Sequence, residues 1–390
     1  MPLMVKNKVE GFKIAKVKAL LLMIVAVLFV SCSDKDYTTC IPRNVSAVLA
    51  VNGMELTGKT SPVYSLVTPF LSEDKKEMKG LDMTKNVYFF ETRDGNFGLC
   101  ASVIDDYDLD DFVKRMSNLG AVENLDEEDG ITSGIIKGSW VMCYNSSALL
   151  VMGPVMNTKA SQEKMCQRMR YLMTEQSEEE SAVATPLWQK LEEIKKPVRM
   201  VAIGSALPEQ FASMFTLCAP KGTNTDDIII EASMEYKDGR LMMYGMTDSF
   251  NEMIRQSLKS SRNVFREMTF DWNSKVSDTM LAGIYMNVKG EDFMTLLQNN
   301  KSLTSILMAS DAYDILKNSD GNVAITLTPK GENILEGGVN AEVEQISTAT
   351  KKSKEKLVAV VNTEALLEEF GGDFASLFNK IKQVVFIIED

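Results

Sequence analysis

The 390-residue sequence contains no histidine. Imidazole is the general base of Ser-His-Asp and Cys-His relays, and it is a ligand in H-E-x-x-H zinc proteases. The sequence therefore excludes these hydrolases and every zinc site that depends on imidazole. We expect no metal site and no cofactor.

The sequence also has no C-x-x-C pair and no excess of positive charge. Without closely spaced pairs, its six cysteines give no zinc or dithiol redox motif. The net charge is −12, whereas nucleic acid and anionic lipid surfaces are bound by basic protein faces. We therefore expect no nucleic-acid partner.

A long hydrophobic run is missing as well, because the apolar stretch at residues 19–30 covers only twelve positions. A helix of that length rises about 18 Å, which is less than the thickness of a bilayer core. Five lysines precede the stretch, so the segment has the basic and apolar regions of a secretory signal. The sequence predicts a signal peptide at residues 1–31.

The leader ends in Leu-Phe-Val-Ser-Cys at residues 28–32, which resembles a bacterial lipobox. Phe29 stands where leucine is usual in that motif. We predict that Cys32 is the lipid attachment site, with residues 32–40 as a tether, so that a palmitate-type chain makes the membrane a partner. The alternative is an ordinary signal peptide followed by an unrelated cysteine.

The segment after Cys32 resembles a known family. It reads Asp-Tyr-Thr at residues 36–38, Ile-Pro at 41–42, Ala-Val at 47–48 and Val-Asn at 51–52, followed by Leu56 and Lys59. This opening is similar to that of an uncharacterised Bacteroidetes lipoprotein family of the domain-of-unknown-function type. The resemblance implies an outer-membrane lipoprotein that faces the periplasm or the cell surface, and it carries over no catalytic residues.

One local pattern, an apolar strand followed by a helix, recurs at residues 46–52, 198–203, 280–287 and 356–362. Asn52, Asn287 and Asn362 stand at three of the strand ends, where asparagine is a good helix N-cap. The recurrence suggests four related units. Helices are predicted at residues 109–119, 158–174, 187–195, 208–217, 249–260, 291–308 and 363–370.

Hairpins are indicated at Asp94-Gly95 and Asp238-Gly239, because Asp-Gly readily forms type I′ turns. A third is expected to turn at residues 145–147. Adjacent hairpins favour antiparallel sheets, and we predict an α+β fold with helices covering one face of each sheet. The polar segment 175–186 is the predicted linker between two related domains at residues 41–174 and 187–390.

Residues 53–60 match the nucleotide-binding pattern G-x-x-x-x-G-K-[ST]. In a P-loop, Lys59 and Thr60 would hold phosphate and magnesium. However, Glu55 brings a negative charge to this loop, and Pro69 would interrupt the helix that must follow. We favour a capped helix here, and the nucleotide hypothesis fails if the segment is helical.

Three other patterns are weaker. Carboxylates alternate at residues 105–111 as in calcium loops, but the EF-hand glycine and glutamate are absent, and a helix capped by Asp108 is the favoured interpretation. Residues 161–164 and 353–356 match S-x-x-K without companion motifs. Glu55, Glu127, Glu128 and residues 178–180 include candidate carboxylate pairs for a glycosidase.

These observations favour a lipid-anchored envelope protein with a binding or structural role, for a glycan or protein ligand. The alternative is a histidine-free, carboxylate-dependent glycoside hydrolase or another polysaccharide-acting enzyme. A close Asp/Glu pair that faces a groove would favour the enzyme.

Overall fold

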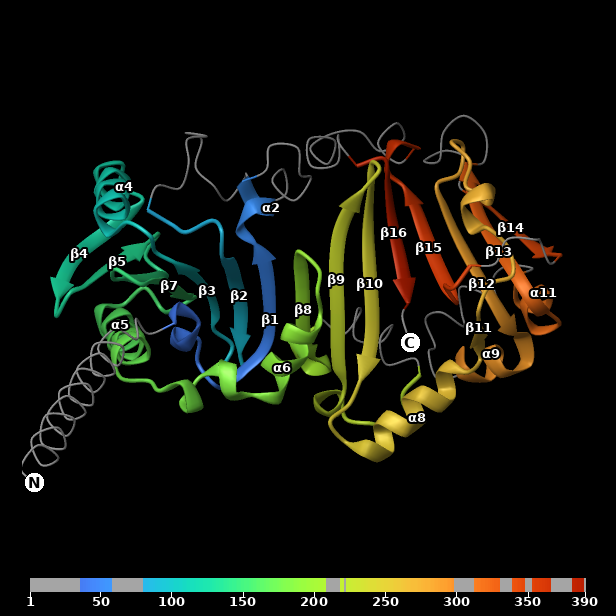
Figure 1. Ribbon diagram of the computed structural model, residues 1–390, viewed down its shortest axis with the longest axis horizontal. Helices are drawn as coiled ribbons and strands as arrows, with labels where there is room; N and C mark the ends of the chain where they lie inside the picture. Colours follow the sequence, from blue (N-terminus) through green and yellow to red (C-terminus); the bar gives the residue numbers. More distant parts are fainter. Residues whose placement is uncertain are drawn as a thin grey trace, which may run out of the picture.

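The computed structural model describes residues 36–57, 80–207, 218–220, 222–297, 312–329, 339–347, 353–365 and 381–388. Within these residues a single 16-stranded sheet runs along the molecule, with helices packed on it (Figure 1). The strands are β1 (Val45–Asn52), β2 (Asn86–Thr92), β3 (Phe97–Ser102), β4 (Val122–Glu128), β5 (Ile131–Ile136), β6 (Trp140–Tyr144), β7 (Ala148–Gly153), β8 (Val198–Ile203), β9 (Ile229–Lys237), β10 (Arg240–Asp248), β11 (Phe265–Arg266), β12 (Ala282–Lys289), β13 (Asp320–Pro329), β14 (Val339–Ile346), β15 (Leu357–Asn362) and β16 (Gln383–Ile388).

The α-helices are α2 (Gly53–Thr57), α4 (Asp106–Asn118), α5 (Lys159–Thr174), α6 (Pro186–Glu193), α8 (Glu252–Arg262), α9 (Gly290–Leu297) and α11 (Ala312–Lys317). The 3₁₀ turns are η1 (Tyr37–Cys40), η2 (Glu178–Glu180), η3 (Ala182–Ala184), η4 (Gly204–Ala206), η5 (Thr225–Asp227) and η6 (Trp272–Lys275). Helices α4, α5, α6 and α8 occupy predicted helical segments, whereas segment 208–217 lies outside the described residues. No helix in the described ranges has the length and apolar character needed to cross a membrane.

The sheet contains two five-strand groups with the same strand order. The first strand group is β3-β2-β1-β8-β9 and the second is β14-β13-β12-β15-β16, with β10 between β9 and β16. Strands β7, β6, β5 and β4 extend the first group to the sheet edge. Among the described strands, only β10 and β16 pair in parallel. The predicted α+β class and antiparallel pairing are confirmed. A duplicated unit would produce this shared order, and the predicted domain boundaries remain a prediction.

The strands of the four predicted strand-to-helix units are present, and the residue after each strand makes the same kind of hydrogen bond. After β8 the described helical residues are only the 3₁₀ turn η4. The first helical residue donates its amide to the carbonyl that precedes the next strand of the unit. These bonds are Gly53 to Lys85 (3.1 Å), Gly204 to Ile228 (2.8 Å), Gly290 to Ser319 (2.7 Å) and Thr363 to Lys382 (3.0 Å). At each glycine, an added Cβ would lie 2.7 Å or less from a backbone carbonyl oxygen. The close approach explains why glycine occupies three of the four junctions.

Two of the three predicted asparagine caps are confirmed. The Asn52 Oδ1 atom accepts from the Met54 amide at 2.9 Å, and the Asn362 Oδ1 atom accepts from the Ala365 amide at 3.3 Å. The prediction for Asn287 is wrong, because α9 begins at Gly290 and the Asn287 side chain instead donates to the Glu267 carbonyl at 2.7 Å.

The Asp-Gly turns differ in geometry. Asp238 and Gly239 have φ values of 54° and 81°, as a type I′ turn requires. Asp94-Gly95 also joins two strands, but in this loop only Gly95 has a positive φ, 81°, so the turn is not type I′. The same left-handed pair occurs at residues 129–130 and 137–138, where sequence reasoning proposed no turn.

Side-chain alternation along β1 shows that helices cover both faces of the first strand group, whereas one face was predicted. Val48 and Ala50 belong to a core that contains residues of α5 and α6, and Val51 belongs to a core that contains residues of α4. In the second group, α9 and α11 cover one face. The other face packs against residues 268–280.

Segment 175–186, predicted as a linker, packs against the core that contains residues of α5 and α6. It contains η2 and η3, and both Ser181 and Ala182 are fully buried. The Gln176 side chain donates to the carbonyls of Thr39 (2.5 Å) and Ile41 (3.1 Å). These bonds attach the start of the segment that leads into α6 to residues 39–41. Helix α6 contributes to the candidate site.

Candidate functional site

The candidate site is a pocket of about 810 Å³ between α6, the end of β10 and α8. It lies where the first strand group meets β10, at the lower edge of the sheet in Figure 1. Its lining is Pro186, Gln189, Lys190, Glu193, Met246, Asp248, Phe250, Arg255, Lys259, Arg262, Asn263 and Lys356.

Helix α6 positions Lys190 because its other face is apolar. The Thr185 hydroxyl accepts from the Trp188 amide at 3.3 Å, and Pro186 fits the first turn, where no amide donor is needed. Leu187, Trp188 and Leu191 are buried in the core. Helical periodicity then directs Lys190 toward β9 and β10.

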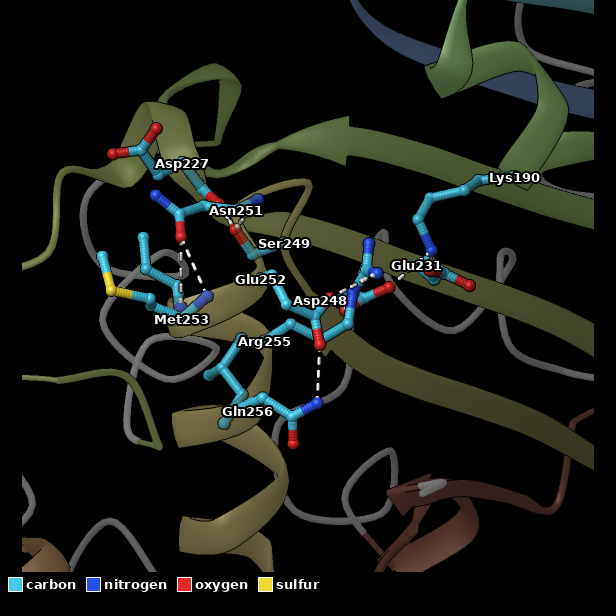
Figure 2. A network of polar contacts seen from close by, with 12 residues as sticks. Lys190, Asp227, Glu231, Asp248, Ser249, Asn251, Glu252, Met253, Arg255 and Gln256 are labelled. Carbon is cyan, nitrogen blue, oxygen red and sulfur yellow. Dashed lines mark hydrogen bonds and ion pairs between the residues drawn. The ribbon is translucent and has the colours of Figure 1, made fainter.

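The Lys190 ammonium joins two carboxylates. Its Nζ atom lies 2.6 Å from Glu231 Oε1 and 2.7 Å from Asp248 Oδ2 (Figure 2). The three side chains are only 14%, 10% and 14% exposed, respectively. Glu231 faces Met246 across β9 and β10, and Ile229 faces Asp248, so the two carboxylates share one face of the sheet. The network is a buried three-charge cluster at the pocket wall.

Protonation in this cluster follows the ion pairs. Burial disfavours the charged form of Lys190, but hydrogen bonds to Asp248 and Glu231 outweigh burial and raise the pKa of Lys190. Burial likewise opposes ionisation of Asp248, but Lys190, the Ser249 amide and Arg255 hold the pKa of Asp248 below its usual value. Lys190 and Asp248 therefore stay charged at neutral pH.

The same aspartate anchors α8. The Arg255 Nε atom donates to Asp248 Oδ1 at 3.0 Å, and its Nη1 atom to Glu252 at 3.2 Å. The Asn251 side chain caps the helix by accepting from two backbone amides, and the backbone amide of Asn251 donates to the Ser249 hydroxyl at 3.0 Å (Figure 2). These contacts hold α8 across the end of β10.

Three cations lie on one face of α8. Arg255, Lys259 and Arg262 have the i, i+4, i+7 spacing that places side chains on a single helix face, and all three line the pocket. Arg262 is only 8% exposed. Its Nε atom donates to the Leu258 carbonyl at 3.4 Å, whereas its Nη1 atom is buried without a hydrogen-bond partner among the described residues. A buried guanidinium nitrogen without a partner is a feature that needs an explanation.

The structure contradicts the nucleotide hypothesis over residues 53–57, which form α2. The Gly53 amide donates to Lys85, and the Met54 amide to Asn52, so the first two amides of the segment are already used within the protein. Lys59 and Thr60 lie outside the described residues, and so does Cys32.

The aspartate-rich segment begins α4, as expected, but its cap is Asp105 and not Asp108. The Asp105 Oδ1 atom accepts from the Asp108 amide at 3.0 Å. Asp110 accepts from the Tyr144 hydroxyl at 2.9 Å and pairs with Lys114. In the part of the chain that the structure describes, no group of three or more Cys, Asp or Glu residues is placed to hold a metal ion.

The remaining sequence candidates are not brought together. The Ser161 hydroxyl accepts from the Thr158 hydroxyl in the first turn of α5, and the Ser353 hydroxyl donates to Glu355. Glu127 and Glu128 lie on the exposed edge strand β4. None of these side chains lines the candidate pocket.

Sequence reasoning did not find the pocket. Glu231 lies 41 residues after Lys190 and Asp248 lies 58 residues after Lys190, and no sequence pattern links the three. The spacing of Arg255, Lys259 and Arg262 was a readable signal, because these cations repeat at helical spacing and the first two lie in the predicted helix 249–260.

Another missed feature is a thiol pair. Cys143 on β6 and Cys166 on α5 are free cysteines whose side chains are hydrogen-bonded. This bond, together with Ser133 and against the effect of burial, lowers the pKa of Cys166 to about 6. Within the described residues, Cys40, Cys100 and Cys218 form no disulfide either.

A model of one protein family, DUF4836, a domain of unknown function, matches residues 73–328. The chain belongs to this family. The match includes the predicted linker at residues 175–186 and most of the candidate pocket. The predicted membership in a family of the domain-of-unknown-function type is thus confirmed. No curated protein matches the chain.

Solved structures of the protein TP0453 have a low similarity to this chain. Crystal form I has a TM-score of 0.38 and 12% sequence identity, and the alignment covers 61% of this chain and 90% of that chain. Crystal form IV has a TM-score of 0.36 at the same identity, with coverage of 53% and 78%. Likeness at this level carries no argument about function.

Proposed function

We propose that this protein is a lipid-anchored protein of the bacterial outer membrane, related to Bacteroidetes lipoproteins, and that its body binds a ligand in the pocket between α6 and α8. The leader and Cys32 support the anchor. The observation that carries the binding role is the pocket itself, whose lining includes the cations Lys259 and Arg262 near the end of α8. An anionic ligand would pair with these cations.

The enzyme alternative depends on a carboxylate pair, and the pair at the pocket has the wrong electrostatics. A glycosidase general acid must keep its proton near neutral pH, which requires a raised pKa. Glu231 and Asp248 instead share the Lys190 ammonium, and the pKa of Asp248 is lowered. The pair therefore supports a structural part in shaping a binding pocket.

The anchor is tested by metabolic labelling with an alkyne fatty acid in the native envelope. We expect label on the wild-type protein and on Cys40→Ala, which removes a different cysteine close by, and no label on Cys32→Ala. Digestion of whole cells with protease then reports whether the body faces the surface. Label that persists in Cys32→Ala would reject the anchor.

The binding role is tested against the enzyme alternative with the purified body. Incubation with envelope polysaccharide should release no new reducing ends, in wild type and in Asp248→Asn alike. Release by wild type that is lost in Asp248→Asn would establish the hydrolase instead.

A further inference from the structure

The pocket has a charge opposite to that of the chain. The net charge of the sequence is −12, yet five of the twelve lining residues are Lys or Arg and only two are Asp or Glu. A concave surface with one sign of charge concentrates ligands of the opposite sign. The lining therefore favours an anion.

Only part of this positive charge is used within the protein. Lys190 pairs with Glu231 and Asp248, and Arg255 pairs with Asp248 and Glu252. Lys259 and Arg262, by contrast, form no ion pair with any residue that the structure describes. These two cations lie side by side on α8, one turn apart.

The helix terminus accounts for only part of the Arg262 geometry. A cation in the last turn of a helix interacts favourably with the unpaired carbonyls, and Arg262 Nε makes such a bond to Leu258. Its Nη1 atom remains buried and unpaired within the described residues. Arg262 also lines the pocket, and phosphate or carboxylate oxygens are the acceptors that a guanidinium binds best.

The pocket is too large for a bare anion and has the groups that a sugar needs. Its volume of about 810 Å³ lies in the range of small-molecule sites. Phe250 is 49% exposed at the wall, which leaves part of its ring free to stack on an apolar sugar face. Gln189, Glu193 and Asn263 supply donors and acceptors for hydroxyl groups.

We infer that this pocket binds a small anionic saccharide, a sugar that carries a phosphate or carboxylate group, with the anionic group held between Lys259 and Arg262 and the ring against Phe250. This inference rests on the proposed binding role and gives it a ligand class.

Isothermal titration calorimetry with defined probes tests the inference. Glucose 6-phosphate and glucuronate should bind the wild-type protein, glucose should bind far more weakly, and higher ionic strength should weaken both anionic sugars. Inorganic phosphate separates the two parts of the ligand. Phosphate that binds as tightly as the sugar phosphate would show an anion site that ignores the sugar, contrary to the inference.

Two variants locate the site. Arg262→Gln should weaken the anionic sugars by about tenfold to a hundredfold, because it removes charge-assisted hydrogen bonds. Lys259→Gln changes an exposed side chain, so it keeps the fold and should weaken binding by about fivefold to tenfold. Arg115→Gln is the matched control, since Arg115 also lies in the last turn of a helix, α4, but is exposed and outside the pocket.

The outcomes separate this inference from the proposed function. Unchanged affinity in both pocket variants would reject the site. If neither glucose 6-phosphate nor glucuronate binds the wild-type protein, the ligand class is rejected. Neither result alters the fatty-acid labelling of Cys32 or the reducing-end assay, which judge the anchor and the enzyme alternative independently.

Discussion

The two strand groups have the same order but are covered and held differently. In the first group helices pack on both faces, and α6 is tied to β9 and β10 by the buried cluster around Lys190. In the second group one face packs against residues 268–280, with Phe270 and Trp272 against Tyr285. Strand order therefore does not determine what covers a sheet. The pocket lies between two helices, α6 and α8, and its lining is rich in charged side chains.

The largest difference between the groups should come from Lys190→Ala. Removing this ammonium leaves Glu231 and Asp248 buried without their shared cation, which should lower the free energy of unfolding by about 3–5 kcal/mol. Urea denaturation measures it. In the second group Lys289→Ala breaks the exposed pair with Asp292 and should leave stability nearly unchanged. Equal effects of the two variants would contradict the buried cluster.

The next effect concerns the glycine junctions, one from each group. Gly290→Ala places a Cβ 2.0 Å from the Leu316 carbonyl oxygen, and Gly53→Ala places one 2.4 Å from that of Met83. We expect a loss of about 1–3 kcal/mol for each, larger at Gly290, because the obstructing atoms are backbone. Gly95→Ala meets no atom within 4 Å, so it isolates the separate cost of a positive φ, about 1–2 kcal/mol. Thermal denaturation ranks the three, and a milder Gly290→Ala would show that the junction relaxes.

Removing a helix cap should change the stability of each group by a smaller amount. Asn52→Ala removes one cap in the first group and should cost about 1 kcal/mol. Asn362→Ala in the second group should cost more, because this buried side chain also donates to the Asp278 carbonyl at 3.0 Å. Chemical denaturation distinguishes them. The reverse order would mean that the Asp278 contact contributes nothing.

The smallest effect is a pH dependence in the first group. Burial opposes the ionisation of Asp94, but hydrogen bonds from Thr92 and Arg168 lower the pKa of Asp94 to about 2. A carboxyl with a depressed folded-state pKa stabilises the fold above its unfolded pKa of about 3.9, and this contribution is lost as pH falls through about 2. Because Asp94 is 47% exposed, we expect less than about 1 kcal/mol. Asp94→Asn should flatten the stability profile between pH 4 and pH 2, and an unchanged profile would exclude the pair.

The sequence predicted the features that depend on short-range geometry. Asp238-Gly239 forms its turn because both residues tolerate left-handed backbone, and Asn52 caps because its side chain reaches the next amides. The Asn287 prediction failed because a tertiary acceptor, the Glu267 carbonyl, takes its side chain. Asp129-Gly130 is the same Asp-Gly dipeptide as Asp238-Gly239 and forms a turn with similar positive φ values, but no turn was predicted there.

By itself the sequence determined the α+β class, the recurrent strand-to-helix units and two of their caps, because each depends on residues within a few positions of one another. Only the tertiary structure decided that the two strand groups share one sheet, that helices cover both faces of the first group, and that Lys190 meets Glu231 and Asp248. Those contacts join segments far apart in the chain. Their formation depends on which buried faces and charges can be satisfied together, and no local pattern encodes that.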